Sequence, residues 1–278
     1  MSTIAATAKA PDWGADPRHP LLDDLRSACM GLTPAQWARL VAACAGHAAV
    51  TTAGRRATAV VTSVGSATAK AKRYVRLGVR AAAAEDLASA KSMVKALPAR
   101  LSATFEQFRA LDRAKQVDEV AQLLVTWLAF FAAGGGPDLE GGLPDLDMAI
   151  AGMGAHRHVF SHSILLGLGV ETSLRFSLAM VDALVDRMPE DRDPVWAKIT
   201  ETSRRYTDRS AAGIWAGIGA HLVNDAGLLG MGATKPVVGL PMHLSMAGHK
   251  LFLAANGAAA LVAAKPSQEP RYMGVIKL

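Results

Sequence analysis

Alanine and leucine dominate this chain, and few of its runs alternate β-branched with polar residues as a half-buried strand would. Hydrophobic residues make up 51% of the 278 residues, but aromatic residues only 5%. Because alanine and leucine are strong helix formers, this pattern favours helices throughout. A chain of this length can bury a core without disulfides or other staples. The sequence therefore predicts an all-α fold, a multi-helix bundle.

Charge divides the sequence into a basic part and an acidic part. Residues 51–115 contain thirteen Lys or Arg and four Asp or Glu, whereas residues 116–150 contain six acids and no Lys or Arg. We therefore expect an N-terminal basic helical region over 1–120 and a second helical domain over 121–278. Within the basic region, Pro98 is expected to divide the chain into two helices.

The basic arm, defined here as residues 51–115, has two interpretations. It is either a solvated helical face or a surface for phosphate-bearing partners, such as an anionic membrane or a nucleic acid. Aromatic residues do not interleave with its charges as a base-stacking platform would require, which makes nucleic acid the less favoured partner.

Residues 120–136 are apolar apart from Gln122 and end in three glycines. This run of seventeen residues lies at the lower edge of the roughly 17–25 that a spanning helix needs. We expect a buried central helix here, while peripheral membrane contact stays open. The N-terminal residues lack the pattern of a secretory signal, so a cytoplasmic location is expected, with the inner membrane as a possible surface.

Two pairs of potential metal ligands share a spacing of four residues. His221 and Asp225 interrupt one apolar helical run, and His158 and His162 stand at the start of another. Residues four apart lie on one face of a helix, so each pair can converge on one cation. The alternative is that these histidines are ordinary core residues, satisfied by hydrogen bonds.

The loop "LPDLDM" adds Asp145 and Asp147 to these pairs. Asp-x-Asp in such a loop is often capping or turn chemistry. However, five of the eight histidines fall between residues 156 and 243, and an unpaired aspartate in an apolar helix would be costly to bury. The combination predicts a divalent metal site between the core helices.

Four motifs between residues 137 and 245 occur in a characteristic order: "LPDLD", "HRHVFSHS", "HLVND" and "GMGATKPVVGLP". This order resembles a bacterial family of predicted metal-dependent hydrolases, often associated with the inner membrane and similar to zinc-dependent phospholipase C. The chain departs from the family in the spacing of its first histidine. His156 keeps the His-Arg dipeptide, whereas His158 keeps the helical spacing from His162, so both stay candidates.

The residues and the resemblance together imply a ligand set of nitrogen and carboxylate oxygen without thiolate. Such a set suits zinc first, with manganese or iron as alternatives, and suits a catalytic site better than a structural one. The candidate ligands are Asp145, Asp147, His156, His158, His162, His221 and Asp225.

The expected function is a metal-dependent hydrolase that attacks a phosphoester, with a phospholipid as one candidate substrate, through metal-activated water. Asp147 or Asp225 is expected to bridge two cations. Arg157 or Lys235 is expected to steady the anionic substrate, and Ser161 or Ser163 to orient a ligand. The alternatives are a non-catalytic, membrane-associated or assembly protein with a vestigial metal site, and a nucleic-acid-binding module.

Overall fold

The computed structural model describes residues 20–152, 156–229 and 236–265. Within these ranges the chain is all-α, as predicted, and its one extended pairing is an isolated parallel bridge between His158 and Val238. The helices are α1 (Pro20–Met30), α2 (Pro34–Leu77), α3 (Val79–Ala110), α4 (Arg113–Gly134), α5 (Leu146–Ala151), α6 (Ile164–Val185), α7 (Val195–Asp225) and α8 (Met246–Ala263).

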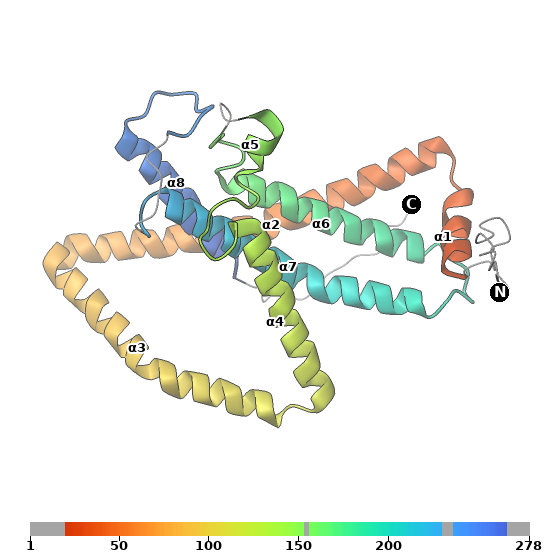
Figure 1. Cartoon of the computed structure of the whole chain (residues 1–278), viewed down its shortest axis with the longest axis horizontal. Coiled ribbons are helices and arrows are strands. Elements are labelled where there is room, and N and C mark those ends of the chain that lie inside the picture. The colour runs from red at the N-terminus through yellow and green to blue at the C-terminus, as the bar shows by residue number, and fades with distance from the viewer. Residues whose placement is uncertain (1–19, 153–155, 230–235, 266–278) are drawn as a thin grey trace, which may run out of the picture.

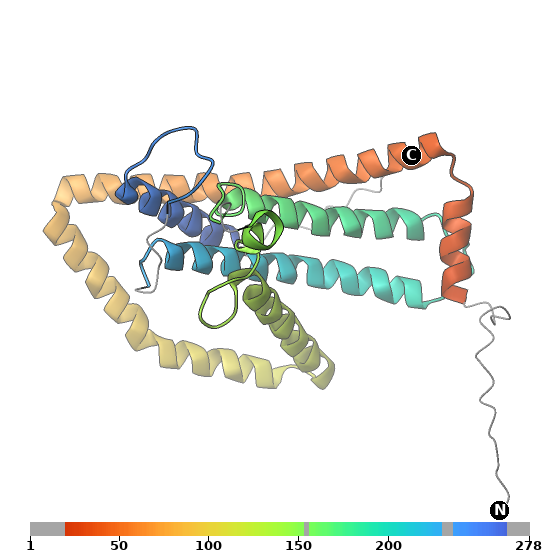
Figure 2. The same cartoon turned by 45° about the horizontal axis from the view of Figure 1, so that its top comes forward.

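Helix α7 is the centre of the bundle. It packs against α4, α6 and α8, and the long helix α2 runs along α6 and α8 (Figure 1). The main core lies around Trp215, Ile218 and Leu222 of α7, together with Leu253 and Ala260 of α8, and all five are buried. Figure 2 shows α3 as an arm that leaves the bundle at the end of α2 and returns to it through α4.

Glycines allow α4 and α7 to approach closely. A Cβ at Gly217 would fall 2.8 Å from the backbone nitrogen of Gly134 and still closer to the carbonyl oxygen of Phe130. A Cβ at Gly213 of α7 would likewise meet the backbone of α4. Because backbone atoms cannot move aside as a flexible side chain can, these glycines fix the distance between the two helices.

We expect Gly217→Ala to destabilise the protein by about 1–3 kcal/mol, the usual cost of overpacking a core. The loss should appear although alanine is the better helix former. The matched control is Gly54→Ala in α2, where a Cβ would meet open space. That change should be neutral or stabilising by up to about 1 kcal/mol. Denaturant unfolding of both variants measures the difference, and equal stabilities would contradict the close packing of α4 on α7.

A buried ionic network ties α2, α6 and α7 together. Glu171 is fully buried, and its carboxylate accepts hydrogen bonds from Arg56 at 2.5 and 2.8 Å, from Arg175 at 2.7 and 2.9 Å, and from Trp215 at 2.7 Å. Arg56 also donates to the carbonyl oxygen of Ala263 at the end of α8. The network holds the first half of α2 against the bundle.

Stability should depend on pH through Glu171. Burial by itself would raise the pKa of this carboxyl, but the hydrogen bonds and positive charges of Arg56 and Arg175 outweigh burial and lower the pKa below its usual value. A carboxyl with a lowered pKa in the folded state stabilises the protein above the unfolded-state pKa. This stabilisation is lost as the pH falls through the folded-state pKa. Unfolding of the wild type and of Glu171→Gln across the acid range should therefore give a stability gap that narrows as the pH falls. A gap independent of pH would contradict the role of the ionised carboxylate.

The domain boundary predicted at residue 120 falls inside α4, and α2 packs on α6 and α8. The structure corrects the predicted break at Pro98. Pro98 does not divide the basic arm, because α3 continues through it. The helices separate instead at Gly78, whose φ of 80° belongs to the region that glycine adopts readily.

The prediction that residues 120–136 form a buried helix is also wrong. Only 11% of the apolar window of α4 is buried, because α4 packs mainly on α7 and exposes its other side. Leu123, Leu124, Trp127 and Leu128 are all exposed, Leu128 to 69%. By length and composition alone, α4 and α6 could each cross a membrane, but this is weak evidence because core helices of soluble proteins meet the same criterion.

Candidate metal centre

A glycine-rich loop after α4 positions Asp145. Helix α4 ends at Gly134, and its C-cap Gly135 has a left-handed φ of 91°. The chain then folds back so that Leu143 donates to the carbonyl oxygen of Ala133 at 3.2 Å. Asp145 occupies the N-cap position of α5, but its side chain makes no cap hydrogen bond. Instead its Oδ2 accepts from the backbone of Gly141 at 2.8 Å, so ordinary capping does not account for this aspartate.

The segment that carries His158 and His162 is not helical. Residues 156–163 form turns, and α6 begins only at Ile164, capped by the Ser163 side chain. The prediction that His158 and His162 share one face of a helix is therefore wrong. The segment is held by backbone hydrogen bonds of Arg157 and Val159 to Val238, both 2.9 Å long.

His158 does not join the candidate site. Its ring stacks on Phe160, with 5.3 Å between ring centroids, and packs against Gly239. Its Nδ1 accepts a hydrogen bond from the backbone of Phe160 at 3.3 Å. Of the two candidates that the sequence left open, His156 lies in the cluster and His158 does not.

His221 and Asp225 share one face at the end of α7, as the spacing of four predicted. His221 Nε2 lies 3.6 Å from Asp225 Oδ2. The other ring nitrogen, Nδ1, lies 3.3 Å from the carbonyl oxygen of Gly134, and Asp225 Oδ1 accepts from Arg157 at 2.6 Å. Both side chains therefore have one atom held by the protein and one directed at the cluster.

Four ligand-type atoms converge at the centre of the cluster. Asp145 Oδ1 lies 3.4 Å from His162 Nε2 and 3.7 Å from His221 Nε2. His162 Nε2 lies 3.4 Å from Asp225 Oδ2. In a tetrahedral site with metal–ligand distances of about 2.0–2.2 Å, neighbouring ligand atoms are about 3.3–3.6 Å apart, which is close to these separations. His162, His221 and Asp225 form one group that could hold a metal ion, and Asp145 forms a second with His156 and His162.

Asp147 and His156 extend the cluster on one side. His156 Nδ1 lies 3.5 Å from Asp145 Oδ1 and 3.8 Å from Asp147 Oδ1. Asp145 Oδ1 therefore stands between the inner group and this outer pair. The bridging role expected of Asp147 or Asp225 stays a prediction.

Six buried atoms of this cluster lack a hydrogen-bond partner within the described ranges, which is costly unless another group satisfies them. On five of the six residues the second polar atom is held by the protein, as for His162, whose Nδ1 lies 3.0 Å from Ser161 Oγ. The unsatisfied atoms are Asp145 Oδ1, Asp147 Oδ1, His156 Nδ1, His162 Nε2, His221 Nε2 and Asp225 Oδ2.

The electrostatics of the cluster favour positive charge at its centre. Burial acts to lower the pKa of His162, but the carboxylates of Asp145, Asp225 and Asp147 outweigh it and raise that pKa. Burial likewise acts to raise the pKa of Asp145, but His162 and His221 outweigh it and lower that pKa. Protons on the histidines would supply this charge, but separations of 3.4–3.8 Å are long for hydrogen bonds. A cation would supply the charge without needing hydrogen-bond geometry.

The structure also places three of the four residues that were expected to contact the substrate or to orient a ligand. Arg157 is only 2% exposed and its guanidinium binds Asp225, so it positions a ligand and cannot reach a substrate. Lys235 lies outside the described residues. Of the two serines, Ser161 contacts His162 while Ser163 caps α6.

The Gly134 carbonyl was not predicted from the sequence. It orients His221 because Gly134 and Gly217 let α4 approach α7 closely, and Gly217 stands about one turn before His221. The only sequence signals were the two glycines four residues apart in "GIWAG" and the run "AAGGG" at the end of the apolar segment 120–136.

Comparisons with protein-family models, curated proteins and solved structures found no match for this chain.

Proposed function

We propose that this protein is a metal-dependent hydrolase that acts on a phosphoester. The observation that carries the proposal is a cluster of six buried and unsatisfied ligand-type atoms, which includes two overlapping groups that could each hold a metal ion. Structural ion pairs rarely leave so many polar atoms without partners, since each unsatisfied buried group costs about 1–3 kcal/mol.

Asp145, His162, His221 and Asp225 would hold the cation. A bound divalent cation at this point would lower the pKa of a coordinated water and polarise a phosphoryl oxygen. Arg157 keeps the Asp225 carboxylate in place, and the Gly134 carbonyl fixes the ring of His221.

Asp147 and His156 lie where a substrate and its attacking water could approach. The His156 side chain is 13% exposed, whereas the His162 side chain is fully buried, so access is from the side of α5. Asp147 Oδ1 and His156 Nδ1 are both able to accept a proton from a water held between them.

The donor set supports zinc as the cation. Imidazole nitrogen and carboxylate oxygen with no thiolate suit zinc, with manganese and iron as alternatives, and the separations of 3.4–3.7 Å between the ligand atoms are close to those of a tetrahedral zinc site.

The experiment is a phosphoesterase assay with p-nitrophenyl phosphate and bis(p-nitrophenyl) phosphate. Protein treated with chelator should be inactive, and added zinc, manganese or iron should restore hydrolysis. His162→Ala should stay inactive with every metal, whereas His243→Ala, which changes an exposed histidine outside the cluster, should respond like the wild type. Equal activity of the two variants would overturn the proposal.

The second candidate is a non-catalytic, membrane-associated or assembly protein, and the surfaces of α3 and α4 favour it. Besides the apolar side of α4, α3 exposes Leu97, Leu101 and Phe105 among its basic residues. Exposed apolar side chains interleaved with Lys and Arg suit an anionic membrane surface. On this proposal the protein would be cytoplasmic and peripheral to the inner membrane.

We expect the basic arm to bind anionic lipid vesicles through its charge. Arg55 and Arg56 are engaged by Asp208 and Glu171 inside the protein, but basic residues such as Lys91, Lys95 and Arg100 are exposed. Because exposed charges are screened within about 10 Å at 0.1 M salt, added salt should release the protein from such vesicles. Equal binding to neutral vesicles would instead indicate insertion of an apolar surface such as that of α4.

A further inference from the structure

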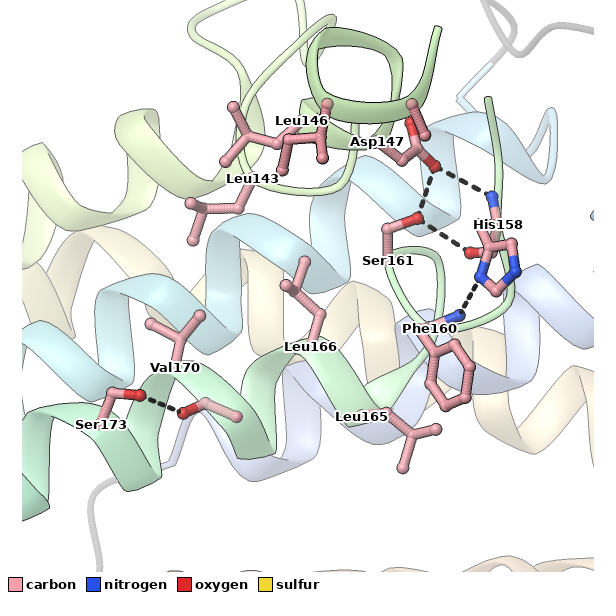
Figure 3. Close-up of a pocket in the computed structure, with 13 residues that line it drawn as sticks. Leu143, Leu146, Asp147, His158, Phe160, Ser161, Leu165, Leu166, Val170 and Ser173 are labelled. Atoms are coloured by element: carbon pink, nitrogen blue, oxygen red, sulfur yellow. Dashed lines mark hydrogen bonds between the residues drawn. The ribbon is translucent and has the colours of Figure 1, made fainter. Parts of the chain in front are cut away.

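An apolar groove of about 610 Å³ lies between α5 and α6, beside the candidate metal centre. Its walls are mostly aliphatic and aromatic, with four polar residues among them, as Figure 3 shows. The residues that define it here are Leu146, Ile150, Phe160, Leu165, Leu166 and Val170. A volume in this range is typical of small-molecule sites, which are mostly apolar with a few placed polar groups.

Three of the four polar residues that line the groove, Asp147, His158 and Ser161, gather at one end, where it meets the cluster (Figure 3). Asp147 and Ser161 both line the groove, and Ser161 Oγ donates to Asp147 Oδ2 at 2.5 Å (Figure 3). The same oxygens reach into the metal centre, because His162 Nδ1 lies 3.4 Å from Asp147 Oδ2 and 3.0 Å from Ser161 Oγ. One wall of the groove is therefore also the edge of the cluster.

The other end of the groove offers no free polar group among the lining residues. The Ser173 hydroxyl donates to the Gly169 carbonyl at 3.0 Å, and the backbone of α6 is bonded within its own helix (Figure 3). A peptide segment would bury backbone N–H and C=O groups there without partners, which is costly. A hydrocarbon chain has no such groups to satisfy.

We propose that this groove binds the hydrocarbon chain of the substrate, with the ester group placed at the Asp147 end. The role of the headgroup rests on the proposed function, whereas chain binding does not depend on it. The bound molecule is then an amphiphile: an alkyl or acyl chain covers Ile150 and Phe160, which are 83% and 64% exposed, and the phosphoester reaches the cluster.

The test measures binding, not turnover, by titration calorimetry below micelle-forming concentrations. Each fully buried methylene strengthens binding about fourfold. Because the groove is open on one side, octyl phosphate should bind the zinc-treated protein at least about tenfold more tightly than butyl phosphate. In the absence of metal, the protein should also bind 1-octanol at least about tenfold more tightly than 1-butanol, because these alcohols probe the groove alone.

The blocking variant is Gly169→Leu. A Cβ at Gly169 meets open space, so leucine there fills the groove from α6 without touching a candidate ligand. It should abolish the preference for long chains while leaving zinc content and butyl phosphate binding unchanged. The matched control is Gly46→Leu, at an exposed position of α2 that is also open, and it should bind like the wild type.

The outcomes separate this proposal from the proposed function. If Gly169→Leu removes the preference for octanol in a protein that takes up no zinc, manganese or iron, the groove proposal is supported and the proposed hydrolase function is overturned. If the protein takes up zinc but binds long and short chains equally, the proposal that the groove binds a hydrocarbon chain is overturned, whereas the proposed hydrolase function is not. A wild-type dimer that Gly169→Leu converts to monomers, with equal binding of long and short chains, would assign the groove to a second copy of the chain and overturn the proposal.

Discussion

Asp225→Asn is expected to abolish the response of this protein's thermal stability to metal chelators. The wild type should melt at a lower temperature after chelator treatment, because a ligand that binds only the folded state at a thousand times its Kd adds about 4 kcal/mol. Asparagine keeps the size of the side chain but removes the charge that Oδ2 presents to His162 and His221. The variant should therefore melt at the same temperature with and without chelator.

The variant will also lose some stability for a reason unrelated to metal. Asp225 Oδ1 pairs with the buried guanidinium of Arg157, and an amide is a weaker partner for it. The chelator response, not the melting temperature itself, is therefore the measured quantity. Asp208→Asn removes a carboxylate outside the cluster, one that pairs with Arg55 and Arg175, and it should keep the wild-type response. If chelator does not change the melting temperature of the wild type, Asp225 serves only in an ion-pair network.

Glu171→Ala is expected to destabilise the protein by about 3–5 kcal/mol. The substitution leaves Arg56 and Arg175 buried and without their main counter-charge, and breaking one partner of a buried ion pair typically has this cost. Urea unfolding measures the loss. Because Glu171 lies outside the cluster, the chelator response should persist in the folded variant.

An exposed ion pair provides the control for Glu171→Ala. Glu85 lies 3.5 Å from Arg73 and its side chain is 56% exposed, so water screens the pair. Glu85→Ala should cost no more than about 1 kcal/mol. Similar losses for the two substitutions would contradict the claim that the Glu171 network holds α2 on the bundle.

The features that could be predicted from the sequence are those set by local rules. Helix-forming composition gave the all-α class, and the spacing of His221 and Asp225 within an apolar run placed both on one face of α7. The clustering of histidines and aspartates led to the residues that the structure brings together. None of these inferences required knowledge of which helices pack against one another.

The features that were missed depend on tertiary structure. Whether His156 or His158 reaches the cluster is decided by the bridge to Val238, eighty residues away along the chain. The apolar run in α4 looks the same in sequence whether another helix covers it or not. Glu171 and Arg175 stand four apart in an apolar helix, which signals a buried pair, but their partner Arg56 is 115 residues from Glu171.

The most direct test of the metal centre is anomalous X-ray diffraction at the zinc edge from crystals of the zinc-treated protein. The account predicts a peak at about 2.0–2.2 Å from Asp145 Oδ1, His162 Nε2, His221 Nε2 and Asp225 Oδ2. Zinc bound only elsewhere, or these four side chains hydrogen-bonded to one another with no peak between them, would contradict it.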